Sequence, residues 1–338
     1  MGNRNILAIG TSAGGVEALQ FLASRLDADL PAAVLVTIHL PSGGGSTLDK
    51  LLSHRGALPA KFAEDGESLR HGVIYLAPPD RHLLIADGHV RLGHGPRENN
   101  SRPAVDPMLR SAALYGADRT IGVVMTGTLG DGASGLCSLA ECGGLIVVQD
   151  PSDAAFAEMP RNALQRVSPD HIVPLAQMPE LLTQLVRQPA GEARIPPNLL
   201  KYEVEVALTG HAGIMEIDRF ARRSPLTCPD CHGTMWEIDE GDLLRYRCHI
   251  GHAYTVDLMS IALDESLRRA LATALRTLEE RVALARKLEM DARQRQKMSV
   301  AADWERRGKE YQKEVGAVRA AILRIDSLEV SQRTKRAG

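Results

Sequence analysis

The sequence predicts an α/β fold built on a mostly parallel, doubly wound sheet. Up to residue 188, short apolar runs alternate with segments that have the 3.6-residue periodicity of amphipathic helices. This alternation is typical of a parallel sheet with helices on both faces. Two later stretches differ in composition: 225–256 is rich in Cys and His, and 257–338 is rich in Ala, Leu, Arg and Glu. We therefore expect a domain over 1–188 that is large enough to be an enzyme domain, and a linker over 189–224. The stretches 225–256 and 257–338 are expected to form two further parts.

The elements of the first part follow in order along the chain. Strands are expected at 6–9, 34–38, 73–77, 82–85, 90–92, 120–125, 144–148 and 172–174. Helices are expected at 16–26, 46–53, 106–116, 132–142, 158–166 and 178–187. Asp87-Gly88 separates two of the short strands, and because this dipeptide favours a tight turn, 82–92 is predicted to form a β-hairpin.

Composition limits the class of protein. The 338 residues carry a formal net charge of -2, which favours neither a nucleic-acid partner nor membrane binding. No apolar run approaches the ~20 residues of a membrane-spanning helix, and the N-terminus lacks a signal-peptide pattern. The chain has five cysteines, three of them in one short cluster, which argues against a disulfide framework. We expect a cytoplasmic protein.

A serine lies in a glycine-rich turn after the first predicted strand. Residues 10–14, Gly-Thr-Ser-Ala-Gly, fit the nucleophile elbow G-x-S-x-G, in which small neighbours permit a strained turn that exposes the serine hydroxyl. The helix that follows offers backbone N–H groups to an oxyanion. Two alternatives are a phosphate-binding loop, in which Ser12 replaces the middle glycine of G-x-G-x-x-G, and an ordinary strand–helix turn. The partners of Ser12 must decide between them.

A serine nucleophile needs a general base, and the base needs an orienting group. His39 follows the strand at 34–38, and Asp131 follows the strand at 120–125. Because catalytic groups gather at the carboxyl ends of parallel strands, these residues and Ser12 are predicted to converge in one crevice. Each also has a simpler interpretation, His39 as a structural histidine and Asp131 as a turn or helix-cap carboxylate. The main competitor for the base is His82, which also lies in a loop.

Several motifs, in order and over roughly residues 5–187, resemble those of the chemotaxis protein-glutamate methylesterases of the CheB type. They are IGTSAGG (9–15), IHLP (38–41), SRPAVD (101–106), MTGTLGDG (125–132), and QD (149–150) followed by EMPRNA (158–163). The resemblance implies Ser12 as nucleophile, His39 as general base and acid, and Asp131 as the orienting carboxylate. Backbone N–H groups near Ala13 and Thr128 are the candidates for the oxyanion hole.

The resemblance also implies the reaction. Family members hydrolyse glutamate γ-methyl esters on chemoreceptor signalling helices, and many deamidate receptor glutamines, through an acyl-enzyme and without a cofactor. Arg102 and Arg161 are candidates for docking an acidic helix, or else solvated surface arginines. The alternatives are an esterase for a different protein substrate and a signalling scaffold that no longer acts on receptors.

Three features depart from the family pattern. Thr128-Leu129 stands where the family usually has methionine and glycine, and Ala13 replaces a common threonine. Typical members also begin with a phosphorylatable receiver domain, whereas this sequence starts at the predicted catalytic strand. We therefore expect a stand-alone form without phosphorylation control in cis, which is constitutive or governed by the C-terminal half.

The Cys/His-rich stretch predicts a structural zinc site. Cys228-Pro229-Asp230-Cys231 is separated by sixteen residues from Cys248, and His252 follows four residues later. Two such pairs fit a tetrahedral site on a small ribbon, with Cys228, Cys231, Cys248 and His252 as ligands. His249 is the alternative fourth ligand, and a metal-free module with buried thiols is the alternative to a metal site. Some stand-alone methylesterases carry a similar CPxC…RCxxGHAY segment.

The last part is predicted to be helical. Apolar residues recur at three- and four-residue steps from 267 to 288 and again from 311 to 325. Two long amphipathic helices over 257–338 are expected, as an antiparallel hairpin or coiled coil. Their apolar stripes pack either on each other, which is the simpler interpretation, or on a second copy of the chain.

Overall fold

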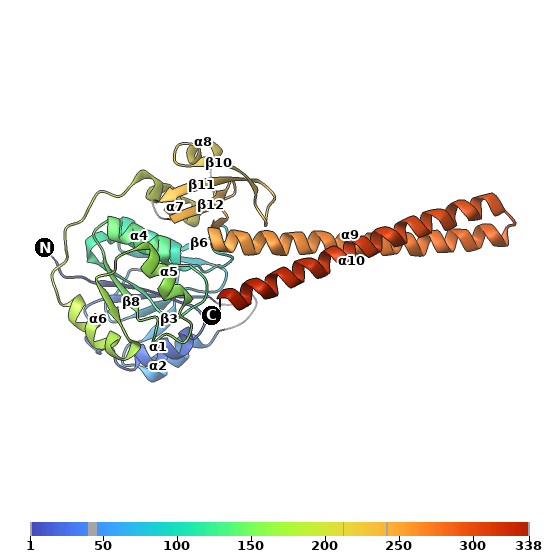
Figure 1. Ribbon diagram of the computed structural model, residues 1–338. Helices are drawn as coiled ribbons and strands as arrows, with labels where there is room; N and C mark the ends of the chain where they lie inside the picture. Colours follow the sequence, from blue (N-terminus) through green and yellow to red (C-terminus); the bar gives the residue numbers. More distant parts are fainter. Residues whose placement is uncertain (1, 40–45, 212, 241–242, 337–338) are drawn as a thin grey trace. The chain divides into compact units, whose positions relative to one another are not determined.

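The computed structural model describes residues 2–39, 46–211, 213–240 and 243–336. It divides into two compact units, Met1–Met259 and Ser260–Gly338. The first unit contains a parallel sheet of seven strands, and Figure 1 shows it among the helices that cover it. The predicted α/β class is confirmed, as are the hairpin, the small antiparallel sheet with a Cys/His cluster and the pair of long helices.

The sheet has the strand order β3-β4-β2-β1-β7-β8-β9. Its strands are β1 (Ile6–Thr11), β2 (Ala33–Ile38), β3 (Ala60–Phe62), β4 (Ile74–Leu76), β7 (Thr120–Val124), β8 (Leu145–Gln149) and β9 (His171–Val173), and the separate hairpin is β5 (His82–Ala86) with β6 (His89–Gly93). The sequence did not predict β3, because its three residues are half-buried and centre on a lysine.

Helices cover both faces of the sheet because successive strand side chains point to opposite faces. Leu7 and Ile9 of β1 pack in one cluster with helices α1, α2 and α6, while Ile6 and Ala8 pack in the other with α3, α4, α5 and the hairpin. The bounds are α1 (Gly15–Ala23), α2 (Leu48–Arg55), α3 (Val105–Tyr115), α4 (Ala133–Glu141), α5 (Glu158–Arg166) and α6 (Met178–Val186). Turns of 3-10 helix occur at Ala117–Arg119 and Leu175–Gln177.

The segment 189–224, which we interpreted as a linker, contains two helices, α7 (Asn198–Thr209) and α8 (Ile214–Ile217). Leu200, Val204 and Ala207 of α7 are buried in the same cluster as α3 and the hairpin. Charged residues interrupt the apolar pattern of α7, and one of them, Glu203, is itself buried. That burial explains why the periodicity was not visible in the sequence.

The Cys/His-rich stretch forms a four-stranded antiparallel sheet, β10-β11-β12-β13. We call this sheet and its loops, residues 222–255, the Cys/His module. The strands are β10 (Arg222–Thr227), β11 (Thr234–Glu240), β12 (Leu243–Cys248) and β13 (Ala253–Thr255). The module packs on α7 through a small cluster in which Trp236 meets Tyr202 and Val206.

The second unit is made by α9 (Val256–Gln294), which begins in the first unit, and α10 (Met298–Arg336). The two helices run antiparallel, since Arg293 Nη2 lies 3.0 Å from Glu305 and Arg281 lies over the ring of Tyr311. Val282 and Val315 are buried in the pair. Among the described residues, no helix combines the length and apolarity needed to cross a bilayer.

Candidate active site

Three neighbouring strands present the predicted Ser, His and Asp at one edge of the sheet. Strand β1 lies between β2 and β7, and Thr11 at the end of β1 pairs directly with Ile38 at the end of β2. Ser12 and His39 are the next residues on each strand, and Asp131 lies in the loop between β7 and α4. The structure therefore brings together the three residues selected from the sequence. Leu40 and Pro41 of the histidine motif lie outside the described residues.

The three side chains form a continuous hydrogen-bonded chain. Ser12 Oγ lies 2.9 Å from His39 Nδ1, and His39 Nε2 lies 2.7 Å from Asp131 Oδ2. Ser12 is half-buried, the His39 side chain is 21% exposed and that of Asp131 is 1% exposed. The row of hydrogen bonds therefore runs from a half-buried hydroxyl to a buried carboxylate. For Nδ1 to accept the serine proton, Nε2 must carry hydrogen and donate it to Asp131. In the serine-protease triad the two ring nitrogens have the opposite roles.

Asp131 is held by hydrogen bonds on both of its oxygens. Oδ2 accepts the Val105 N–H at 2.7 Å, and Oδ1 accepts the Asp106 N–H at 3.1 Å and the Asn99 side-chain amide at 3.0 Å. The first two donors belong to the first turn of α3, where the helix dipole favours a negative charge. Burial raises the pKa of Asp131, but the hydrogen bond from His39 and the other donors outweigh it and bring the pKa to about 2. The carboxylate therefore stays charged at neutral pH.

Two backbone donors near Ser12 have no partner among the residues that the structure describes. Ser12 N–H donates to Thr126 O at 3.0 Å, whereas the N–H groups of Ala13 and Thr128 make no hydrogen bond within the described part of the chain. Gly127 allows the close approach of the two loops, since a Cβ there would overlap Met159 Sδ and lie 3.0 Å from Ser12 Cβ. The two free donors are those expected for an oxyanion hole.

The departure from the family pattern at Thr128-Leu129 has a structural consequence. Leu129 has φ 67°, in the left-handed region that favours glycine. Two contacts hold it there, because its N–H donates to Glu158 Oε2 at 2.8 Å and its carbonyl accepts from Asn162 Nδ2 at 2.7 Å. These two contacts hold the loop that carries Asp131 in a left-handed turn although residue 129 is not glycine.

The other polar candidates occupy different settings. His82 is fully buried, with Nε2 bonded to Pro96 O and Nδ1 accepting the Ala104 N–H, so it is a structural histidine. Arg102 is paired within the domain, because Nε and Nη2 donate to Asp80 Oδ1. Arg161 is exposed.

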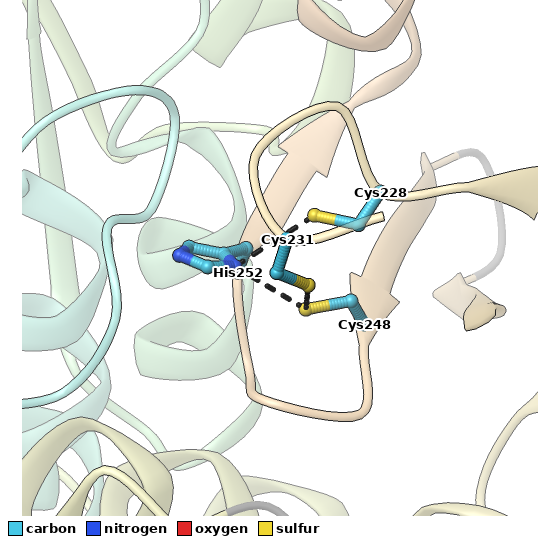
Figure 2. A group of neighbouring side chains, drawn as sticks. All are labelled: Cys228, Cys231, Cys248 and His252. Carbon is cyan, nitrogen blue, oxygen red and sulfur yellow. Dashed lines mark hydrogen bonds between the residues drawn. The ribbon is translucent and has the colours of Figure 1, made fainter. Parts of the chain in front are cut away.

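Cys228, Cys231, Cys248 and His252 converge in the Cys/His module (Figure 2). Their potential ligand atoms all lie within 4.8 Å of one another. Cys231 Sγ and Cys248 Sγ are 3.6 Å apart, and His252 Nδ1 lies 3.4 Å from Cys248 Sγ. A tetrahedral zinc site with Zn–S bonds of about 2.3 Å separates its sulfurs by roughly 3.8 Å, so this cluster could hold a metal ion.

The fourth position of the cluster belongs to His252, not to His249. The His249 ring packs against Gly233, where no Cβ would fit, and it is not part of the cluster. His252 presents Nδ1 to the sulfurs, while its Nε2 lies 3.9 Å from Asp230, which accepts a hydrogen bond from Tyr254 Oη. A carboxylate behind the second ring nitrogen is typical of metal-bound histidines.

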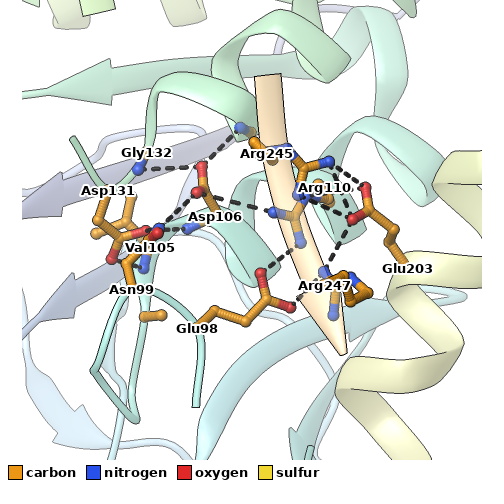
Figure 3. A network of polar contacts seen from close by, with 12 residues as sticks. Glu98, Asn99, Val105, Asp106, Arg110, Asp131, Gly132, Glu203, Arg245 and Arg247 are labelled. Carbon is orange, nitrogen blue, oxygen red and sulfur yellow. Dashed lines mark hydrogen bonds and ion pairs between the residues drawn. The ribbon is translucent and has the colours of Figure 1, made fainter. Parts of the chain in front are cut away.

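Sequence analysis missed a buried polar network between the aspartate and the Cys/His module (Figure 3). Arg110 of α3 pairs with Glu98 at 2.8 Å, and Arg247 of β12 pairs with Glu98 at 3.0 Å and with Glu203 at 2.8 Å. Arg245 donates to both oxygens of Glu203. No local sequence motif predicts these residues, because their partners lie in distant parts of the sequence.

Asp106 links this network to Asp131. Its Oδ1 accepts the N–H groups of Gly132 and Gly135, and its Oδ2 accepts the Asn99 amide at 2.9 Å. Burial and the negative charge of Asp131 raise the pKa of Asp106. The Asn99 amide thus lies between the two carboxylates and donates to both Asp106 and Asp131.

A Ser–His–Asp chain at the carboxyl edge of an α/β sheet is typical of serine hydrolases. The family model of the CheB methylesterases matches residues 7–182. The chain belongs to the CheB methylesterase family, whose members are protein-glutamate methylesterases/protein-glutamine glutaminases.

Individual relatives agree with this assignment. A protein-glutamate methylesterase/protein-glutamine glutaminase of Methanosarcina mazei is 36% identical over 192 residues, which are 54% of this chain and 52% of the relative. A Leptospira interrogans protein provisionally assigned the same two activities is 35% identical over 184 residues, 54% of this chain and 95% of that protein. The crystal structure of the Thermotoga maritima CheB methylesterase catalytic domain matches with a TM-score of 0.52 and 34% identity, over 55% of this chain and 100% of that one. The chain thus spans about half the length of some relatives and nearly all of others.

Proposed function

We propose that the chain hydrolyses glutamate γ-methyl esters on chemoreceptor signalling helices, releasing methanol, and deamidates receptor glutamines by the same route. The observation that carries this proposal is the chain of hydrogen bonds from Ser12 through His39 to Asp131, located inside the segment that matches the family. Residues 1–188 form the catalytic domain in this proposal, and no cofactor takes part in the reaction.

The proposed mechanism is acyl transfer through Ser12. As Ser12 Oγ attacks the γ-carbonyl carbon, its proton passes to His39 Nδ1, and the Asp131 carboxylate stabilises the imidazolium through Nε2–H. Collapse of the tetrahedral intermediate breaks the bond to the methoxy oxygen, which takes the proton from His39 and leaves as methanol. Water then attacks the acyl-enzyme with His39 as base, which restores Ser12 and yields glutamate. With glutamine, ammonia leaves in place of methanol.

The N–H groups of Ala13 and Thr128, which make no hydrogen bond to any residue that the structure describes, are the proposed oxyanion hole. Donors that point at the developing charge contribute most in a site that excludes water, and removal of one donor costs on the order of 10² to 10³ in turnover. Both positions depart from the common family residue, but a backbone donor does not depend on the side chain. The substitutions at 13 and 128 are therefore compatible with catalysis.

Zinc is the proposed occupant of the Cys/His cluster, in a structural role. Three thiolates and one imidazole favour zinc over magnesium or calcium, which take oxygen ligands. All four positions are filled by protein atoms, whereas a catalytic zinc site keeps one position open. The ion would hold the loop before β11 to the turn between β12 and β13.

The test is methanol release from methylated chemoreceptor cytoplasmic fragments, with Ser12→Ala as the key variant. The control is Ser24→Ala, which removes an exposed hydroxyl at the end of α1. Release by the wild type and by Ser24→Ala, with loss in Ser12→Ala, supports the proposal. A folded, metal-loaded wild type that releases no methanol would shift the assignment to a different ester or to a scaffold.

A further inference from the structure

Asn99 connects the Cys/His module to the proposed catalytic aspartate. The residue is 5% exposed, and its side-chain amide donates to Asp131 Oδ1 at 3.0 Å and to Asp106 Oδ2 at 2.9 Å. Its backbone N–H donates to the carbonyl of Ala253 at 2.9 Å. Ala253 is the first residue of β13 and follows His252 of the metal cluster. One residue thus bonds to the module with its backbone and to the active site with its side chain.

The module holds the chain around Asn99 at further points. The Ala253 N–H donates to Arg97 O at 3.3 Å, and Glu98 forms a parallel bridge with Ala253. The Glu98 carboxylate lies between Arg110 of α3 and Arg247 of β12. Loss of the Arg247 contact would leave a buried charge without one of its partners, which is strongly unfavourable. Residues 97–99 are therefore fixed to the module by backbone and side-chain contacts together.

Asn99 also adopts a backbone conformation that needs support. Its φ is 51°, and Asn100 follows with φ 61°. Asparagine tolerates this left-handed region better than most residues, but the conformation persists because surrounding contacts fix it. In Asn99 these fixing contacts are the backbone bond to Ala253 and the side-chain bonds to the carboxylates of Asp106 and Asp131.

We infer that Asn99 is a positioning residue for Asp131, and that the Cys/His module sets the reactivity of Ser12 by holding Asn99 in place. Among the described residues, Asp131 Oδ1 accepts from the Asn99 amide and the Asp106 N–H, so without the amide the Asp106 N–H is the donor that remains. A carboxylate less firmly held orients the His39 ring less well, and a misplacement of about 1 Å can cost on the order of 10² in rate. This inference rests on the proposed function in taking Ser12 as the nucleophile, and the metal-stripping test also uses the proposed zinc.

The test uses a probe that does not depend on the natural substrate. A fluorophosphonate reacts with an activated serine, forming an Oγ–P bond and breaking the P–F bond while the serine proton passes to His39. We expect Asn99→Gly to lower the maximal rate of Ser12 labelling on the order of 10²-fold and to leave the half-saturating probe concentration unchanged. Glycine accepts the left-handed backbone, so the variant removes the amide without adding strain.

The matched control is Asn100→Gly, which alters the neighbouring asparagine with the same backbone conformation but an exposed side chain. It should label at the wild-type rate. Asn99→Asp keeps the side-chain volume and removes the donor, so it should be as slow as Asn99→Gly. The low-field proton resonance of the His39–Asp131 hydrogen bond should shift or broaden in both Asn99 variants only. Wild-type labelling and an unchanged resonance in the Asn99 variants would overturn the positioning role.

The part played by the module is tested by stripping the metal from the full-length protein and by Cys248→Ser. Both should slow Ser12 labelling and perturb the same proton resonance while the far-ultraviolet circular dichroism of the main sheet and helices persists. Labelling and resonance that stay at wild-type values after metal loss would overturn it, as would a wild type that is not labelled at Ser12. Labelling that depends on Asn99 in a chain that releases no methanol would retain this inference and reject the proposed substrate.

Discussion

Arg247 and Glu98 form an ion pair 149 positions apart in the sequence, with Nη2 and Oε1 separated by 3.0 Å and both side chains at most 1% exposed. Arg247 belongs to β12 of the Cys/His module, and Glu98 lies in the loop that approaches Asp131 through Asn99. Removing one partner of such a buried ion pair is costly, because the other charge stays buried without compensation. The module and the seven-stranded sheet domain therefore share a polar core and are expected to unfold together.

The buried acids of this core make stability depend on pH. Burial raises the pKa of Glu203, but Arg110, Arg245 and Arg247 outweigh it and hold the pKa well below its usual range. A depressed pKa contributes stability above the unfolded value of about 4.3, and that contribution is lost as the pH falls toward the folded value. We predict that Glu203→Gln is less stable than the wild type by roughly 3 kcal/mol at pH 7 and that the gap narrows below pH ~4.

Urea unfolding at a series of pH values measures this gap. The matched control is Glu205→Gln, on the same helix but exposed, which should change stability little at any pH. A gap for Glu203→Gln that widened toward acid pH would contradict the assigned ionisation.

Asp131→Asn tests the orienting carboxylate. An amide cannot accept all the donors that surround Asp131, and it leaves His39 without a charged partner. In the serine-protease triad the equivalent change costs about 10⁴ in turnover, and we expect a loss of several orders of magnitude in methanol release. The melting temperature should be recorded in parallel, because a variant that lost activity only by unfolding would not support the role.

Gly127→Ala tests the close contact behind Ser12, the proposed nucleophile. The added methyl group would overlap Met159 Sδ and press on Ser12 Cβ, so overpacking should lower stability by about 1 to 3 kcal/mol. Turnover should fall as well, because the turn that carries Ser12 must shift. Gly316→Ala is the comparison, since a Cβ there meets nothing within 4 Å and neither glycine has a left-handed backbone. Equal activity of the two variants would contradict the need for glycine at 127.

The Cys/His cluster should bind about one metal ion per chain. Metal analysis of purified protein should show zinc, lost in Cys228→Ser and His252→Ala and retained in His249→Ala. Cys137→Ser is the thiol control, because Cys137 lies on α4 and donates to Arg166 O at 3.3 Å. Loss of metal in His249→Ala with retention in His252→Ala would contradict the ligand set.

The sequence alone was sufficient where the signal is local. Apolar runs ending in a polar residue located Ser12 and His39 at strand ends, and the Cys spacing located the Cys/His cluster. The same pattern selected Asp131 after the strand at 120–125, and the resemblance to a family supported all three. Each of these predictions depends on residues close together in the chain or on motifs in a fixed order.

The parts that could not be predicted depend on distant contacts. Glu203 looked like one more charge in a polar segment, and only the fold shows that Arg245 and Arg247 surround it. Asn99 carried no signal, because its partners Asp131 and Ala253 come from two different parts of the chain. Buried polar networks satisfy their hydrogen bonds across the whole fold, so sequence spacing does not reveal them.

The most direct test of the account is whether two substrates share one acyl-enzyme at Ser12. Methyl and ethyl γ-esters of the same receptor peptide would be hydrolysed in water containing deuterated methanol, and the ratio of free acid to deuterated methyl ester measured by mass spectrometry. If the leaving alcohol departs before the acyl group is captured, both esters must give the same ratio, and Ser12→Ala must give neither product. Ratios that differ between the two esters, or products that persist in Ser12→Ala, would contradict acyl transfer through Ser12.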